Sequence, residues 1–215
     1  MDHMPADWLV SYANGQYPLV VVPTLSGTGP GDTVGTVGAY TQQLQGYGFK
    51  VCGSQWGVGE DPVGEAEAAL GAINTYGFDG WVMNGEKAYE GGGKSAAYAM
   101  RFRESRPHFP LGWTPEIRLN LDHSVLQRKG VFYMPQVYPG EISWLSLDYA
   151  VQWALEFGYK LENVGPLVQA YETNGVRPPA TVYRDDARRL GLGQLTLYTG
   201  NQCLDAPNFW PSLVV

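Results

Sequence analysis

The sequence has little of several features that mark common classes of protein. Only two of its 215 residues are cysteines, Cys52 and Cys203, so they can form one bridge at most and no disulfide framework. Lysine and arginine number 14 against 21 acidic residues, which gives a net charge of −7. Because no basic surface is available to neutralise a phosphate backbone, nucleic acid is not expected as a partner.

Other absences narrow the class further. No apolar run is long enough to span a bilayer, so membrane insertion is not expected. The start of the chain, residues 1–5, lacks the basic and apolar regions of a signal peptide. The three histidines are isolated from one another, and the glycine-rich segment 27–31 lacks the spacing of a dinucleotide or phosphate loop. We therefore expect neither a metal site nor a cofactor.

What is present is a regular series of apolar, β-rich runs that predict strands. Several of them, such as residues 19–22, are continuously apolar, which is typical of strands in a parallel sheet covered on both faces. The seven runs are residues 19–25, 49–56, 78–83, 111–114, 131–137, 164–171 and 194–198.

Helix signals lie between these runs. Asp61 and Pro62 predict a helix start, and the segment 146–157 has the same amphipathic pattern. A glycine followed by an apolar residue, typical of a helix end that leads into a strand, recurs at Gly48, Gly77, Gly130, Gly158 and Gly191. The intervals are 29, 53, 28 and 33 residues, and the longest holds two units. The repeat is therefore a strand plus a crossover helix.

Eight such repeats fit the length of a minimal barrel. We predict an α/β fold, a single (β/α)8 TIM-type barrel domain spanning residues 1–215. Its first strand is irregular, because residues 13–16 are too short to connect Trp8–Tyr12 to the next strand as a parallel crossover. Trp8–Tyr12 is then either a short helix or a strand that closes the barrel irregularly. A doubly wound open parallel sheet is the alternative.

Polar residues that follow the strands are the candidates for a site, since active sites of parallel β/α folds lie at the carboxyl ends of the strands. Three carboxylates, Glu86, Glu116 and Glu172, end different strands and are expected at one mouth. Paired carboxylates suit glycosidic bond cleavage, in which one donates a proton and the other acts as nucleophile or base. Trp56 and Trp113 are expected to stack on sugar rings there.

The segment Tyr76–Glu86 resembles the fourth-strand signature of the chitinase-like family-eighteen glycoside hydrolases, in which a Phe-Asp-Gly start leads to the catalytic glutamate. The resemblance implies that Glu86 is the general acid and that Asn84 stands at the aspartate that assists the substrate N-acetyl group. Met134–Tyr138 resembles the family's sixth-strand segment, where a tyrosine, here Tyr138, faces the sugar. Val82 occupies the position of the middle aspartate, a departure from the pattern.

The same segment is also similar to barrel modules in tail proteins of phages that infect actinobacteria, which carry a Gly-x-Asp-Gly-Trp-x-x-Asn-x-Glu run, then Tyr-Glu (Tyr89 and Glu90 in this chain) and later Pro-Gln-x-Tyr, here Pro135–Tyr138. That resemblance implies a polysaccharide or peptidoglycan target, a place in the virion tail or outside the cell, and other tail proteins as partners. If Trp8–Tyr12 is strand one, Glu86 and Glu172 end strands four and seven, which resembles the large clan of retaining glycosidases.

Two hypotheses follow. The first is a glycoside hydrolase that acts on an amino-sugar polymer of the cell wall or surface. The second is a catalytically inactive barrel that binds surface carbohydrate as an adhesion module, which Val82 and Asn84 favour. The predicted catalytic residues are Glu86, Glu172, Asn84 and Tyr138, and the predicted substrate-binding residues are Trp56, Trp113, Gln136, Tyr171 and Glu116.

Overall fold

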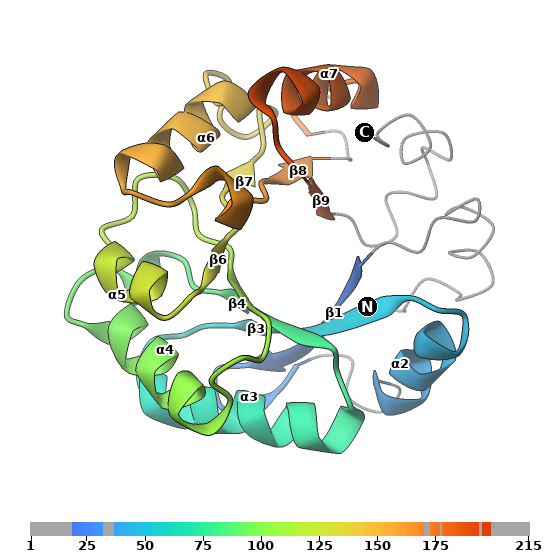
Figure 1. The fold of residues 1–215 in the computed structure, drawn as a ribbon, viewed down its shortest axis with the longest axis vertical. Coiled ribbons are helices and arrows are strands. Elements are labelled where there is room, and N and C mark those ends of the chain that lie inside the picture. Colours follow the sequence, from blue (N-terminus) through green and yellow to red (C-terminus); the bar gives the residue numbers. More distant parts are fainter. Residues whose placement is uncertain (1–18, 32–36, 170–172, 177, 194, 199–215) are drawn as a thin grey trace. The chain divides into compact units, whose positions relative to one another are not determined.

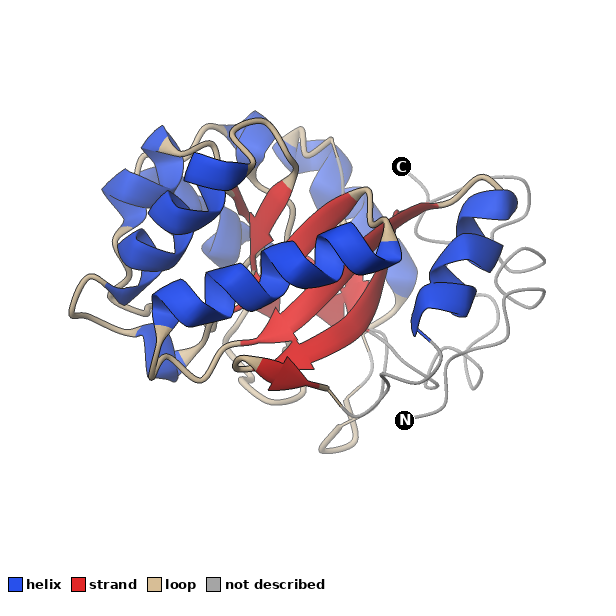
Figure 2. Cartoon of the chain, turned by 90° about the horizontal axis from the view of Figure 1, so that it is seen from below, coloured by secondary structure: helices blue, strands red, loops and turns tan. Residues whose placement is uncertain are grey.

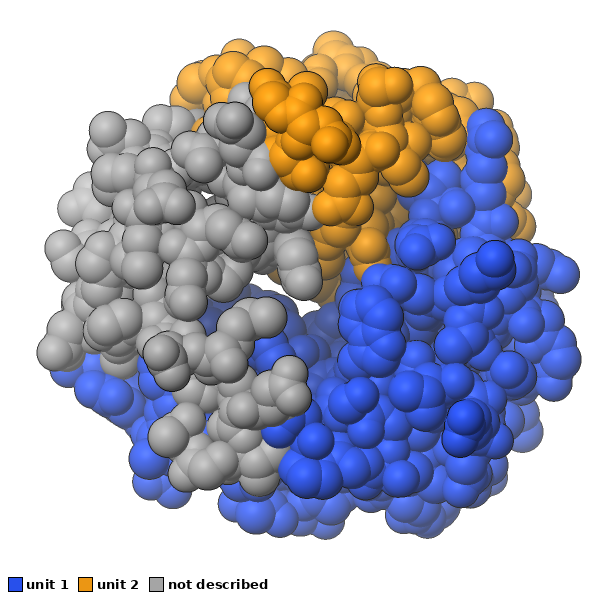
Figure 3. Space-filling view, turned by 180° about the vertical axis from the view of Figure 1, so that it is seen from behind, with its two compact units in different colours: residues 1, 16–132 blue, residues 2–15, 133–215 orange. Residues whose placement is uncertain are grey.

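The computed structural model describes residues 19–31, 37–169, 173–176, 178–193 and 195–198. Contacts within the chain divide it into two compact units, whose described parts lie in residues 19–132 and 133–198 (Figure 3). The predicted Trp8–Tyr12 element lies outside the described residues.

Unit 1 contains a mostly parallel sheet in the order β2-β1-β3-β4-β5-β6 (Figure 1). Its strands are β1 Leu19–Ser26, β2 Gly29–Pro30, β3 Lys50–Trp56, β4 Gly80–Asn84, β5 Leu111–Trp113 and β6 Phe132–Tyr133, whose second residue is the first described residue of unit 2. Its helices are α2 Val37–Gly46, α3 Pro62–Tyr76, the 3₁₀ turn η1 Lys87–Tyr89, α4 Lys94–Ser105 and α5 His123–Arg128. The three longest, α2, α3 and α4, lie on one face of this sheet, and α3 crosses it diagonally (Figure 2).

Unit 2 has a three-stranded parallel sheet in the order β7-β8-β9. Its elements are β7 Gln136–Val137, α6 Leu147–Glu156, the 3₁₀ turn η2 Leu161–Asn163, β8 Leu167–Gln169, α7 Ala180–Leu190 and β9 Thr196–Tyr198. Helices α6 and α7 lie side by side (Figure 1).

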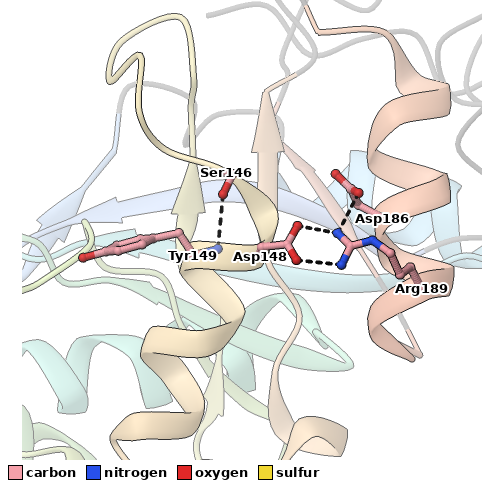
Figure 4. Close-up of polar contacts among 5 residues, drawn as sticks. All are labelled: Ser146, Asp148, Tyr149, Asp186 and Arg189. Carbon is pink, nitrogen blue, oxygen red and sulfur yellow. Dashed lines mark hydrogen bonds and ion pairs between the residues drawn. The ribbon is translucent and has the colours of Figure 1, made fainter.

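An ion-pair network joins α6 to α7 (Figure 4). Ser146 caps α6 by accepting a hydrogen bond from the Tyr149 N–H at 3.2 Å. The Asp148 carboxylate, two residues after Ser146, accepts hydrogen bonds from both terminal nitrogens of Arg189 on α7. Arg189 also donates a hydrogen bond to Asp186 at 2.8 Å. The hydrogen bonds from Arg189 lower the pKa of the Asp148 carboxyl.

The predicted helix ends are confirmed. All five predicted glycines have positive φ, between 62° and 93°. The apolar residue after each glycine is buried, with at most 4% of its surface exposed. At four of the five ends its N–H closes the helix on a carbonyl five residues earlier, as Phe49 does on Leu44 at 3.1 Å. The glycines are needed there because a side chain would strain the left-handed backbone.

One predicted strand is wrong in extent. Residues 131–137 were expected as a single strand, but the structure divides them into β6 and β7, which belong to different sheets. Pro135 lies between the two and has no N–H to donate to a ladder, so pairing is interrupted there. Its carbonyl still accepts a hydrogen bond from Leu167 N at 2.9 Å.

Candidate functional site

The carboxyl ends of β3 and β4 bring two predicted site residues together in unit 1. Parallel pairing aligns Trp56 with Asn84 on the neighbouring strand and with Ser26 on the other side. Trp56 is 49% exposed although it ends a strand whose other residues are largely buried. Asn84 is half-buried beside it. The edge therefore combines an exposed indole with a polar amide, which suits contact with a sugar ring.

Glu86 follows two residues after the end of β4. It is half-buried and immediately precedes η1, and its side chain makes no capping hydrogen bond to that turn. Its backbone carbonyl accepts a hydrogen bond from Tyr89 N at 2.8 Å. Glu86 and Asn84 thus lie at the same sheet edge, separated only by the buried Gly85.

Trp113 is at the end of β5 as predicted, but it presents no ring face to solvent. Its side chain is 0% exposed, and its Nε1 donates a hydrogen bond to the Gly85 carbonyl at 3.0 Å. A Cβ at Gly85 would lie 2.3 Å from the indole. The expectation of a sugar-stacking platform is therefore corrected: in this structure the ring supports the backbone next to Glu86. Glu116 is exposed in the loop after β5, the strand that pairs with β4.

The other predicted residues lie in unit 2 or outside the described residues. Gln136 is half-buried at the start of β7, and Tyr138, just after that strand, is 7% exposed. Tyr171 and Glu172 lie outside the described residues, directly after β8. The prediction that Glu86 and Glu172 act together as paired carboxylates therefore stays a prediction.

Two buried polar residues that hold loops next to strand ends, one in each unit, were not predicted from the sequence. Gln169, at the end of β8, is 0% exposed and binds the Gly140 N–H and the Val176 carbonyl at 2.9 and 3.0 Å. It thereby holds the loop after β7. A glutamine in an otherwise apolar predicted strand was the available signal.

The second is Glu65, on α3, which is 0% exposed. Its carboxylate accepts hydrogen bonds from Gly59 N at 2.8 Å and from the Tyr89 hydroxyl at 2.9 Å. Burial raises the pKa of Glu65, and these hydrogen bonds oppose the increase. In the sequence, Glu65 lies one turn before Ala69 and two turns before Ile73, on the apolar face of the helix. An acidic residue on that face was the available signal for a buried carboxylate.

A chain of hydrogen bonds extends from the backbone of Glu65 through the core of unit 1. Gln55 donates to the Glu65 backbone carbonyl at 3.0 Å and to the Gly27 carbonyl at 2.6 Å. The Tyr98 hydroxyl donates to Gln55 Oε1 at 2.8 Å and accepts from Trp81 Nε1 at 3.0 Å. Such a satisfied network fixes one arrangement of the strand ends, since an unpaired buried group would be costly.

Among the described residues, no group of three or more histidine, cysteine, aspartate or glutamate side chains could hold a metal ion. Within the same ranges, no helix has both the length and the apolar character needed to cross a membrane.

Comparison with known proteins shows the fold. No family model matches the sequence, and neither does any curated protein. A GH18 chitinase from Pseudoalteromonas aurantia is similar in structure, with a TM-score of 0.72 and 14% identity over 99% of this chain and 98% of that one. A putative chitinase A from Streptomyces coelicolor is also similar, with a TM-score of 0.66 and 18% identity over 85% of this chain and 78% of that one.

A variant of NCR from Zymomonas mobilis also matches, with a TM-score of 0.60 and 14% identity over 100% of this chain and 83% of that one. The chain thus has a parallel α/β fold of the TIM-barrel type, as predicted. Identities this low show the fold alone, and a fold hosts many chemistries.

Proposed function

We propose that the chain is a glycoside hydrolase that acts on an amino-sugar polymer of a cell wall or cell surface. The observation that carries the proposal is the placement of half-buried Glu86 beyond β4, at the sheet edge that also carries Asn84 and exposed Trp56. Similarity in fold to GH18 chitinases supports the amino-sugar class.

In the proposed reaction, Glu86 in its acid form gives a proton to the glycosidic oxygen as the bond between that oxygen and the sugar's anomeric carbon breaks. Asn84 holds the N-acetyl group of the reacting sugar by a hydrogen bond from its amide, and Trp56 stacks on a ring. Water then adds to the anomeric carbon, and its proton returns to Glu86. Glu116, Gln136, Tyr138, Tyr171 and Glu172 are the further residues proposed to contact the glycan or assist the reaction.

The second candidate is an inactive carbohydrate-binding barrel of a phage tail or a secreted assembly, with other tail proteins as partners in the first case. Two observations favour it. Buried Val82 replaces an acid of the chitinase signature, and Asn84 carries no charge that could support a proton transfer at Glu86. A binding module needs the Trp56 edge but not the acid.

The test compares wild type, Glu86→Gln and a control, Glu67→Gln at an exposed position of α3, on chitin oligosaccharides and purified peptidoglycan. The hydrolase proposal expects new reducing ends from wild type and from Glu67→Gln at a comparable rate, with a loss of at least about a hundredfold in Glu86→Gln. Equal binding of the glycan by all three proteins without release of reducing ends would establish the binding module instead.

A further inference from the structure

The buried carboxylate of Glu65 lies where the packing of α3 does not require it. The neighbouring buried residues of the helix are apolar, among them Ala66, Ala69 and Ile73. A buried carboxyl group costs free energy unless hydrogen bonds compensate it. Both oxygens of Glu65 are bound, and the two donors come from outside α3: the Gly59 N–H precedes the helix and the Tyr89 hydroxyl belongs to η1.

Through Tyr89, Glu65 reaches the turn that carries Glu86. Tyr89 is the last residue of η1 and 0% exposed, and its N–H binds the Glu86 carbonyl at 2.8 Å. Its ring packs edge-on against the Trp113 ring, with 5.1 Å between the ring centroids, and Trp113 donates a hydrogen bond to the Gly85 carbonyl. The backbone on both sides of Glu86 is therefore anchored, by Trp113 at residue 85 and by Glu65 at residue 89.

The loop after β3 lies directly against the same turn. A Cβ at Gly57 would lie 2.5 Å from the Tyr89 ring, and one at Gly59 would lie 2.3 Å from the Ala88 carbonyl oxygen. Only glycine permits this approach, since a backbone carbonyl cannot move aside as a flexible side chain can. Glu65 joins the two segments, because one oxygen binds the loop at Gly59 and the other binds Tyr89.

We propose that Glu65 and Tyr89 form a positioning pair, which fixes the turn from which Glu86 projects while neither residue touches the glycan. The inference rests on the proposed role of Glu86 as acid. Positioning of an acid matters because a small displacement of a reacting group costs far more in rate than in binding.

The experiment uses the full chain with Tyr89→Phe, Glu65→Met and the double variant, because a glutamine at residue 65 could still donate to the Tyr89 hydroxyl. The matched control is Glu67→Met, at an exposed position of α3, whose carboxylate accepts a hydrogen bond from Arg101 of α4. Hydrogen exchange of the Tyr89 and Glu90 amides reports on the turn without reference to activity, and kcat and KM on a chitin oligosaccharide report on the acid. Thermal unfolding checks that each variant folds, and Tyr89→Phe, which removes a single oxygen, is the mildest change.

In both single variants we expect exchange at these two amides to be faster by about tenfold, as for the loss of one buried hydrogen bond. We also expect kcat to fall while KM stays within about twofold. The double variant should be no worse than the poorer single one, since both break the same link. Glu67→Met should change neither readout.

Unchanged exchange in Tyr89→Phe and Glu65→Met overturns the pair as an anchor. Faster exchange with unchanged kcat overturns its effect on the acid. A wild type that hydrolyses no glycan refutes the proposed function, and the exchange data then still decide whether the pair holds the turn.

Discussion

A methyl group added at Gly85 should destabilise unit 1, because the space that it needs is already filled by Trp113. The added Cβ would lie 2.3 Å from Cζ2 and 2.6 Å from Cε2 of the indole, well inside van der Waals contact. Trp113 is fully buried, is bonded through Nε1 to the Gly85 carbonyl and packs against Tyr89, so it cannot swing aside. Overpacking of this kind costs about 1–3 kcal/mol.

Urea denaturation followed by circular dichroism measures the effect. If the free energy of unfolding falls by about 2 kcal/mol per molar urea, a destabilisation of about 2 kcal/mol lowers the urea concentration at the unfolding midpoint by about 1 M. The matched control is Gly71→Ala in α3, where an added Cβ meets nothing within 4 Å. That change should stabilise by about 0.5–1 kcal/mol, because alanine favours the helix. A Gly85→Ala midpoint equal to that of wild type would refute the close packing of Trp113 on this turn.

Two further predictions concern polar groups that hold strand ends. Asp79 is partly buried, which acts to raise its pKa, but hydrogen bonds from Val51 N–H, Gln45 and Lys50 outweigh this and lower the pKa below 3.8. A lowered folded-state pKa means stability that is present above the unfolded value and lost as the pH falls through the folded one. Unfolding curves over pH should therefore show Asp79→Asn less stable than wild type at neutral pH, with the gap closing in acid; a gap independent of pH contradicts the account. Gln169→Met should cost about 1–3 kcal/mol, because it leaves the Gly140 N–H unpaired and removes one of the two hydrogen bonds that the Val176 carbonyl accepts. Thermal denaturation that matches wild type would argue against that clamp.

Much of the fold was predictable because its signals are local. Asp61 caps α3 through its side chain and Gly77 ends it in the left-handed conformation, as the sequence predicted from those residues alone. The length of the strand over residues 131–137 was wrong because Pro135 was read as part of an apolar run. The missing N–H of a proline hardly changes the hydropathy of a segment, but it removes a hydrogen bond that strand pairing needs.

The candidate site was predictable only in part, since burial depends on distant contacts. Trp56 and Trp113 both follow apolar runs, yet one is 49% exposed and the other 0%. What separates them is the packing of Trp113 against Gly85 and Tyr89, which no local pattern contains. Glu65 resembles any acid in the first turn of a helix, where solvent exposure is usual. Its burial follows from Tyr89, 24 residues along the chain.

The glycine helix ends also bear on the order in which the chain folds. At Gly48, Gly130, Gly158 and Gly191 the closing hydrogen bond spans five residues, so each junction loses little chain entropy when it forms. Parallel strand pairs such as β3 and β4 instead join residues nearly thirty apart, as in the pairing of Cys52 with Gly80. Contacts of short range form early, and those of long range limit the rate. Each helix thus reaches its strand with the exit direction already set, and the slow step is left to the sheet.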